Sequence, residues 1–185
     1  MGRLQDDLRQ RRPFASPAEE AYLNLIRTAD QLARGVALVL RPHKLSEAQY
    51  NVLRILRGAG TEGHTCSEVA TRLVTHDPDV TRLLDRLETR GLLVRAREHS
   101  DRRVVTTRIT RQGLALLDTL DGPVRDAVDR ALAHVPAARL TSLTTLLELA
   151  RTPAAPTAPG TSARAARAGG RAPAAPSAAT RTRAR

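Results

Sequence analysis

The chain has 185 residues, a formal net charge of +11, and a composition that is 41% hydrophobic but only 2% aromatic. So few aromatic rings argue against an RNA-binding surface that stacks bases. The positive charge favours a polyanionic partner, and the length predicts one domain with an appended segment.

Several functional classes are excluded by what the sequence lacks. The only cysteine is Cys66, so no intrachain disulfide can form. The N-terminus is polar, and no apolar run approaches the roughly 20 residues of a membrane span. We find no metal-ligand spacing among the five His and no catalytic constellation. We therefore expect a cytoplasmic protein that is not an enzyme, has no metal site or cofactor, and does not contact membranes.

The first predicted element follows an N-terminal arm, residues 1–15, which we expect to be flexible. A helix is predicted over about 16–41, with Ser16 as its N-cap and Glu19 completing a capping box. Its apolar residues recur at helical spacing and include Tyr22, Leu25, Ile26 and Leu40.

Two shorter helices follow, each with a capping-box signature. Ser46 and Gln49 mark the start of the first, and Thr65 and Glu68 mark the start of the second. The glycine-containing segment from residue 58 to residue 63 separates them.

Asp77 and Pro78 are expected to open the fourth helix, and Gly91 to close it. One stripe along it is apolar and is predicted to face the core. That stripe comprises Val80, Leu83, Leu84 and Leu87.

After Gly91 the pattern indicates a β-hairpin. Residues 92–97 and 104–109 are short runs of strand type, joined by a charged loop at 98–103. Thr110 then caps a fifth helix that Gly122-Pro123 should kink or interrupt, and a last helix runs from Pro136 to about Arg151.

The helices at about 16–41 and 110–151 carry more apolar surface than a lobe of roughly 65 residues can cover, which predicts partner helices from a second copy. The alternative is that they fold back on their own lobe. Residues 152–185 contain six Arg, no acid and no large apolar side chain, so we expect this tail to be disordered.

The outward face of the fourth helix is the candidate for reading DNA. It carries Arg82, Asp85 and Thr89, flanked by Thr81 and Arg86. A major groove admits one helix, and Arg there can pair bidentately with guanine. The alternative is an ordinary solvated face.

Two acids at the start of this helix need an explanation, because they would repel phosphates. One interpretation is that Asp77 is a buried cap. Asp79 then either faces away or accepts a hydrogen bond from a cytosine amino group.

The hairpin loop holds Asp101, Arg102 and Arg103. Adjacent arginines at a loop tip can reach a narrow minor groove, and Asp101 can hold one of them in a fixed rotamer. The alternative is an ordinary exposed hairpin loop.

The order of these segments resembles the MarR family of bacterial transcriptional regulators over about residues 17–151. The resemblance is carried by LSEAQYNVL, SEVATRL, VTRLLDRLETRGLLVR, DRR and ITRQG. It implies a mainly α fold with a small β-hairpin: a winged helix-turn-helix lobe at about 45–113 and dimerisation helices at about 16–41 and 110–151, within one domain at 16–151.

The resemblance also implies partners and site residues. The partners are double-stranded DNA, a second copy of the chain, and a small-molecule effector. Carried over by position, Thr81 and Arg82 touch the major groove, Arg103 enters the minor groove and Asp101 braces the wing. The entry at His76–Asp79 departs from the commoner Ser/Thr-rich entry of the family.

The effector pocket implied by the family lies between the first, second and fifth helices. Tyr22, Leu25 and Tyr50 are candidate lining residues there, although core packing explains them equally well. Cys66 does not match the position of the oxidant-sensing cysteines of some relatives, which favours a structural or bystander thiol over a redox sensor.

Two functions remain open at this stage. The first is a ligand-responsive repressor that acts as a homodimer on a pseudo-palindromic operator. The second is a non-specific DNA-coating or architectural winged-helix protein aided by its basic tail, which would show little preference for any sequence and a steep salt dependence.

Overall fold

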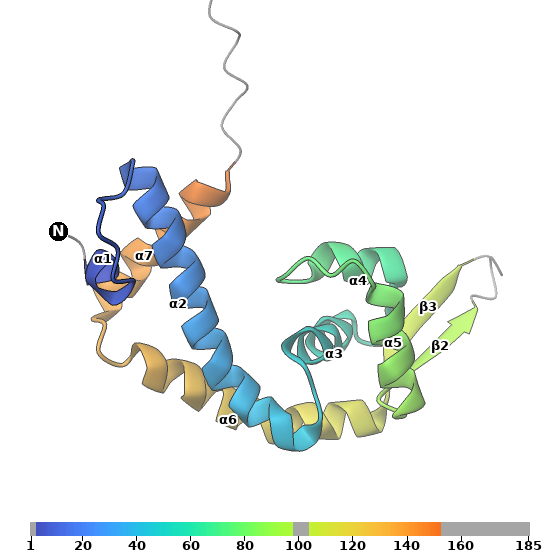
Figure 1. Cartoon of the computed structure of the whole chain (residues 1–185). Helices are drawn as coiled ribbons and strands as arrows, with labels where there is room; N and C mark the ends of the chain where they lie inside the picture. The colour runs from blue at the N-terminus through green and yellow to red at the C-terminus, as the bar shows by residue number, and fades with distance from the viewer. Residues whose placement is uncertain (1–2, 98–103, 153–185) are drawn as a thin grey trace, which may run out of the picture. The chain divides into compact units, whose positions relative to one another are not determined.

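The fold was analysed in a computed structural model that describes residues 3–97 and 104–152. The helices are α1 (Arg3–Asp7), α2 (Pro17–Leu40), the 3-10 helix η1 (Arg41–His43), α3 (Glu47–Ala59), α4 (Cys66–Arg72), α5 (Val80–Thr89), α6 (Arg111–Leu132) and α7 (Ala137–Arg151). The strands are β1 (His64–Thr65), β2 (Leu93–Arg97) and β3 (Val105–Ile109). Figure 1 shows their course, and the fold is the predicted mainly α fold with a β-hairpin.

The chain divides into two compact units, Met1–Pro136 and Ala137–Arg185. The first contains every element from α1 to α6, and the second contains α7. The domain expected at 16–151 thus extends over both units, and the expected disordered tail lies outside the described residues apart from Thr152.

Local capping signals start most of the helices where the sequence predicts. The Ser46 side chain accepts from the Gln49 N–H, and the Gln49 side chain accepts from the Ser46 N–H, which completes a capping box. Thr65 and Glu68 form a second box in the same way. These reciprocal bonds satisfy backbone donors that a helix start would otherwise leave unpaired.

At the first long helix the capping differs in one detail. Ser16 accepts from the Glu19 N–H at 3.1 Å, as an N-cap does, but the Glu19 carboxylate reaches the backbone N–H of Ala15 at 2.6 Å. The N-terminal arm, which was expected to be flexible, contains the short helix α1. In α1 the Leu4 side chain is only 4% exposed. Burial of one leucine, worth about 2 kcal/mol, gives this short helix a reason to form.

The core of the first unit joins the winged lobe to the long helices. The side chains with no exposed surface include Leu40, Leu53, Leu56, Val69, Leu84, Leu87, Leu93, Leu117 and Leu120. Helix α3 is central, since it contacts α2, α4, α5, α6 and β3. Aliphatic side chains therefore fill this core, as the scarcity of aromatic residues requires.

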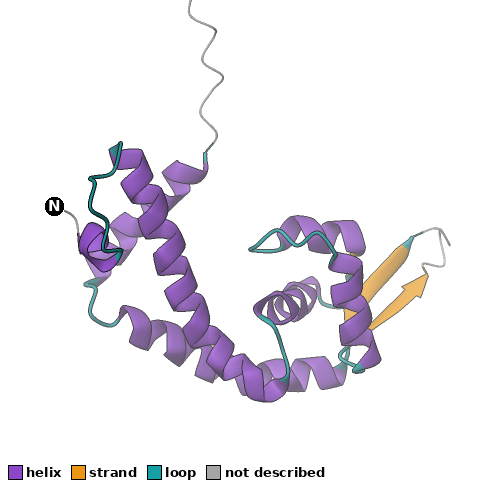
Figure 2. Ribbon diagram, in the orientation of Figure 1, coloured by secondary structure: helices purple, strands orange, loops and turns teal. Residues whose placement is uncertain are grey.

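The sheet has one strand more than expected. Strand β3 lies between β1 and β2, and both pairings are antiparallel. Figure 2 shows the strands beside α5 in the winged lobe. The sequence predicts only a break before Thr65, because a two-residue strand has no periodic pattern and is defined only by its distant partner, residues Thr106 and Thr107.

Helix α6 runs without interruption through Pro123, so the predicted interruption is absent. Proline removes one backbone donor and crowds the preceding turn. On either side of it, Leu120 is fully buried and Val124 is 9% exposed, so both halves of the helix are held by the core. Tertiary packing here outweighs the local signal for a break.

Candidate nucleic-acid interface

Helix α5 buries one stripe and presents the other face to solvent, as predicted. Val80 and Leu83 are 7% and 8% exposed, and Leu84 and Leu87 are completely buried. Since α5 is anchored along this stripe against α3, Arg82 points away from the core and is exposed. The geometry leaves this face of α5 open for a partner.

The start of α5 corrects the expected cap. The N-cap is Asp79, whose side chain accepts from the Arg82 N–H at 3.1 Å, and α5 begins at Val80. Asp77, half-buried, accepts from the Asp79 N–H at 2.8 Å. Asp77 is therefore not the helix cap: it closes a turn across Pro78, and that turn delays the helix by two residues.

The two arginines on the outward face of α5 are unengaged. Arg82 and Arg86 are exposed, and within the described residues neither guanidinium has a hydrogen-bond or ion-pair partner in the protein. They lie one helical turn apart, on the same side of the helix. Two guanidinium groups that are available and spaced in this way can bind phosphate or guanine.

Thr81 contacts α4 through its hydroxyl. Its Oγ1 lies 3.7 Å from the Sγ of Cys66, the first residue of α4. Cys66 is half-buried and packs against the core, which is compatible with the structural or bystander thiol expected from the sequence. The contact joins the first helix of the helix-turn-helix to the outward face of the second.

The acids on α5 are held by an arginine of β2 whose partners no local sequence pattern reveals. From β2, Arg95 donates its Nε–H to Glu88 at 2.8 Å and also bonds Asp85. These bonds raise the pKa of the Arg95 guanidinium, the Glu88 hydrogen bond most of all. One of the two negative charges that would repel DNA is thereby balanced, and β2 is tied to α5.

The stem of the wing is well defined by its register. Leu93 pairs with Ile109 at the base, and Arg97 pairs with Val105 at the last described step. The residues predicted at its tip, Asp101, Arg102 and Arg103, lie outside the described residues. The stem follows directly from the end of α5.

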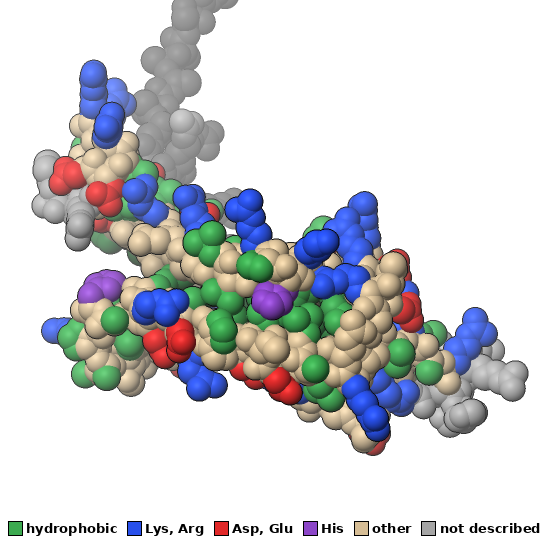
Figure 3. Space-filling view, turned by 90° about the horizontal axis from the view of Figure 1, so that it is seen from below, with side chains coloured by type: hydrophobic (Ala, Val, Ile, Leu, Met, Phe, Trp, Pro, Cys, Tyr) green, Lys and Arg blue, Asp and Glu red, His purple; other side chains and the backbone are tan. Residues whose placement is uncertain are grey.

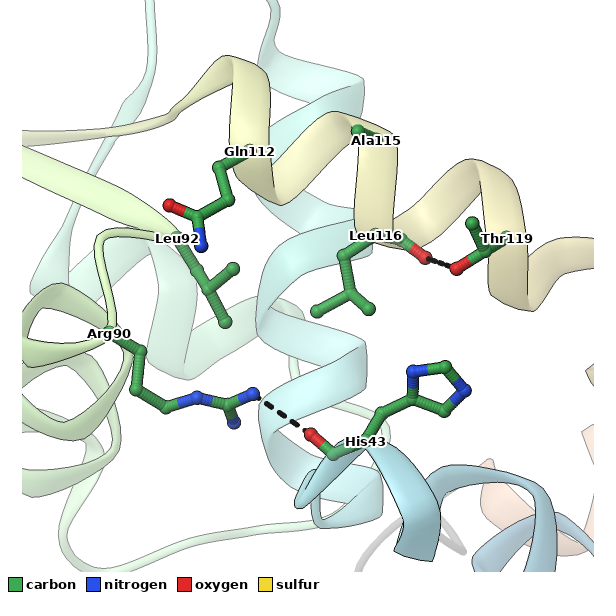
Figure 4. A pocket seen from close by; sticks show the side chains of 7 residues that line it. All are labelled: His43, Arg90, Leu92, Gln112, Ala115, Leu116 and Thr119. Atoms are coloured by element: carbon green, nitrogen blue, oxygen red, sulfur yellow. Dashed lines mark hydrogen bonds between the residues drawn. The ribbon is translucent and has the colours of Figure 1, made fainter.

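The three residues considered for an effector pocket have different environments. Tyr50 is 7% exposed, and burial raises the pKa of its phenol, whereas Tyr22 and Leu25 on α2 are 61% and 41% exposed. None of them lines a hollow of about 540 Å³ between η1, the end of α5 and α6. Figure 4 shows that hollow and its lining side chains.

A paired network connects α3 to α6 beside Tyr50. Arg57 donates to both carboxylate oxygens of Asp121, at 2.6 and 3.2 Å. The hydrogen bond from Arg57 holds the pKa of Asp121 below its ordinary range. The bidentate pair fixes the winged lobe to the long helix.

The described residues contain neither a metal-ligand cluster nor a helix suited to a bilayer. In that part of the chain, no three His, Cys, Asp or Glu side chains gather as a metal site would require. None of the helices at 3–97 and 104–152 combines the length and apolar character of a bilayer span.

The family model described as "MarR family" matches residues 45–105, the segment that holds α3 to the start of β3. The crystal structure of a MarR transcription factor from Planctomyces limnophilus is 43% identical, with a TM-score of 0.58, and the match covers 74% of this chain and 99% of that one. A mutant MarR from E. coli, solved in complex with operator DNA, is 25% identical with a TM-score of 0.63, covering 69% of this chain and 90% of that one.

Among curated relatives, the homoprotocatechuate degradative operon repressor of Escherichia coli is 29% identical over 105 residues, which are 57% of this chain and 70% of that protein. These likenesses agree with the helix-turn-helix and wing observed here. The chain belongs to the MarR family of winged helix-turn-helix transcriptional regulators.

Proposed function

We propose that this protein is a transcriptional repressor that reads operator DNA through α5. The observation that carries the proposal is the pair of unengaged arginines, Arg82 and Arg86, on the exposed face of a helix anchored by its opposite stripe. In the major groove, Arg82 would pair with a guanine and Thr81 would contact a neighbouring base. Asp79 keeps its helix-capping bond and has a second carboxylate oxygen available to a cytosine amino group.

The wing would add a second contact with DNA. Its stem leaves the end of α5, so its tip would follow the duplex away from the recognition helix. There Arg103 would enter the minor groove, Arg102 would contact the backbone, and Asp101 would brace the tip. The Arg95 bonds to Glu88 support this arrangement because they set the angle between stem and helix.

The acting species in this proposal is a homodimer on a pseudo-palindromic operator. Tyr22 and Ile26 on α2 are 61% and 50% exposed, and Leu146 and Leu149 on α7 are 62% and 69% exposed. Apolar residues of this size on two long helices need a partner surface. On the face drawn in Figure 3, hydrophobic side chains are open to solvent between basic ones. A symmetric dimer would place two copies of α5 about one helical turn of DNA apart.

The direction of regulation and the domain limits are part of the same proposal. The named function of the E. coli relative, an operon repressor, supports repression. We assign the regulatory domain to residues 16–151 and treat 152–185 as an appended basic segment. A small-molecule effector would release the DNA by changing the placement of the two recognition helices.

The proposal is tested by measuring sequence preference. Genomic footprinting with the purified protein would identify a site, and fluorescence anisotropy would then compare that site with random DNA. A specific regulator is expected to prefer its site by about 10³-fold or more. A small preference with a steep salt dependence would instead indicate a DNA-coating protein.

A chain ending at Arg151 provides the control for the tail. If residues 152–185 act only through charge, their removal will weaken binding to random DNA more than binding to the operator. Loss of the site preference itself in the shortened chain would argue against reading by α5.

A further inference from the structure

We propose that a cleft between α1, the N-terminal half of α2 and the segment after α6 binds a free α-amino acid with a polar side chain. The cleft has a volume of about 440 Å³, which lies in the range of small-molecule sites. No residue of α3 or α6 lines it, whereas the pocket that the family resemblance implies lies between α2, α3 and α6. Amino-acid binding there does not depend on repression or on operator recognition.

Helix α2 supplies a polar stripe to this cleft. Asn24, Arg27, Thr28 and Gln31 are three or four residues apart, so they lie on one face of the helix. The short helix α1 borders the same face and contributes Leu4, which is 4% exposed. Figure 1 shows α1 beside α2, with the segment that follows α6 next to α1. Three stretches that are far apart in the sequence therefore meet at one polar surface.

Two opposite charges in the cleft face one another without a direct hydrogen bond. Arg27 Nη2 lies 4.0 Å from Asp7 Oδ2, whereas a charge-assisted hydrogen bond spans about 2.8 Å. Within the residues that the structure describes, this is the only polar contact of either side chain. The N–H donors of Arg27 and the acceptor sites of Asp7 therefore remain available to a ligand.

The spacing of this pair favours a ligand that carries both charges. A free α-amino acid holds its carboxylate and its ammonium group on the same carbon. The carboxylate can accept hydrogen bonds from Arg27 while the ammonium donates to Asp7, so two ion pairs lie antiparallel and every charge is matched. A simple anion would be repelled by Asp7, and a simple cation would be repelled by Arg27.

The rest of the lining favours a polar side chain on the ligand. Asn24 donates through Nδ2 to the Glu20 backbone oxygen at 2.9 Å, which orients its amide and leaves Oδ1 as an acceptor. The side chains of Thr28 and Gln31 form no hydrogen bond with any other described residue. His134, in the segment after α6, adds an exposed imidazole. A carboxamide or hydroxyl group on the ligand would satisfy these groups.

Binding would also hold the N-terminal arm against α2. Among the described residues, the Asp7–Arg27 pair is the only ion pair or hydrogen bond between α1 and α2, and an exposed pair of this kind contributes little stability. A ligand bound to both residues adds bonds across this contact. Trypsin cleavage after the exposed Arg9 and Arg11 should therefore become slower when the cleft is occupied.

L-Glutamine is the probe, and two analogues serve as matched controls. Glutaramate lacks only the ammonium group, and 4-aminobutanamide lacks only the carboxylate. Titration of the full chain would be followed by amide chemical shifts in ¹H–¹⁵N spectra. Glutamine is expected to shift Asn24, Thr28 and Gln31 at millimolar or lower concentration. Each analogue should bind at least about tenfold more weakly, because one set of charge-assisted bonds is lost.

Two substitutions identify which charge binds which group of the ligand. Arg27→Gln should bind glutamine no better than 4-aminobutanamide, and Asp7→Asn should bind glutamine no better than glutaramate. Both side chains are about half exposed, so neither change should lower the unfolding temperature appreciably. Arg34→Gln is the matched control, because Arg34 pairs with Asp30 on the same helix but does not line the cleft. That variant should keep the full preference for glutamine over both analogues.

Four results would overturn the assignment of this cleft: equal binding of glutamine and its two analogues, shifts confined to another region, no binding of glutamine up to millimolar concentration, or binding of glucose as tightly as glutamine. Unchanged trypsin cleavage in the presence of bound glutamine would contradict a ligand that joins α1 to α2. Because the cleft contains no residue of α5 or of the wing, a failure of operator binding would leave amino-acid binding intact.

Discussion

Arg95 on β2 makes three hydrogen bonds to the single carboxylate of Glu88 on α5: Nε at 2.8 Å, a terminal nitrogen at 2.6 Å and the backbone N–H at 3.1 Å. Because the bonded groups include both side chain and main chain, the strand cannot rotate against the helix without breaking the set. These bonds therefore tie the described stem of the wing to α5.

Arg95→Ala is expected to lower both stability and DNA affinity. The loss of a partly exposed, multiply bonded pair should cost about 1 kcal/mol of unfolding free energy. Affinity should fall further because Asp85 and Glu88 would then repel phosphates. Thermal unfolding and anisotropy measure the two effects. Adding Asp85→Asn and Glu88→Gln should restore part of the affinity. If it does not, the loss of affinity comes from a changed placement of β2 against α5 and not from charge repulsion.

Arg82→Ala is expected to cost on the order of 1–3 kcal/mol at the operator and to relax preference at one base position. The reason is that Arg82 is exposed and unengaged on the outward face of α5. Binding to single-base variants of the site would reveal the position. Arg34→Ala, on α2 and paired with Asp30, is the control. Unchanged affinity and selectivity in the Arg82 variant would remove α5 from its assigned role.

Arg103→Ala is expected to weaken binding with less effect on major-groove preference. An arginine in the minor groove responds to groove width rather than to a donor and acceptor code. The measurement is the same anisotropy series, extended to operators with and without an A·T run beside the half-site. If the variant loses affinity equally on both sets of operators, Arg103 contacts the DNA phosphate backbone and not the minor groove.

Ile26→Glu is expected to convert a dimer into a monomer. Ile26 is 50% exposed on the apolar side of α2, and a charge there cannot be buried against a second copy without a large cost. Light scattering at micromolar concentration gives the mass. Gln31→Glu, on the same helix but at a polar position, should remain dimeric. A monomeric unsubstituted protein at that concentration would contradict the homodimer directly.

The Arg57–Asp121 pair is expected to make the protein lose stability in acid. Its pKa in the folded protein lies below the ordinary value of 3.8, chiefly because of the hydrogen bond from Arg57. A depressed carboxyl pKa gives stability that is present above the unfolded value and is lost as the pH falls through the folded one. Asp121→Asn should therefore be less stable at neutral pH and lose less stability below about pH 4.

Chemical denaturation at several pH values measures this difference. The Glu68 pKa is also lowered, mainly by the hydrogen bond from the Thr65 backbone N–H. The Asp121→Asn variant will therefore still lose some stability in acid. Only the difference between the two proteins reports on Asp121. Parallel stability curves for both proteins would show that the Arg57 pair has no net effect.

Much of this fold follows from local signals. Ser46, Thr65 and Thr110 start their helices because each supplies an oxygen to a backbone N–H three residues later, an interaction that needs no distant partner. The apolar stripe of α5 is local in the same sense, because helical spacing alone places Leu84 and Leu87 on one side. These features locate α5 and its outward arginines from sequence alone.

Other features were decided only by contacts between distant segments. Strand β1 exists because Thr106 and Thr107 pair with it, and Pro123 stays within α6 because Leu120 and Val124 are held by the core. The cap at Asp79 in place of Asp77 depends on the turn across Pro78. In each case a long-range or turn-specific energy outweighs a local preference.

The candidate sites divide in the same way. The sequence by itself identified Arg82 and Arg86 as outward cations, because exposure follows from periodicity. It did not identify Arg95 as the partner of Glu88, or Arg90 as the donor to the backbone carbonyls of His43 and Lys44, since both depend on how β2 and η1 fold back against the end of α5. Periodicity determines which way a side chain faces, but only the tertiary structure determines what it meets there.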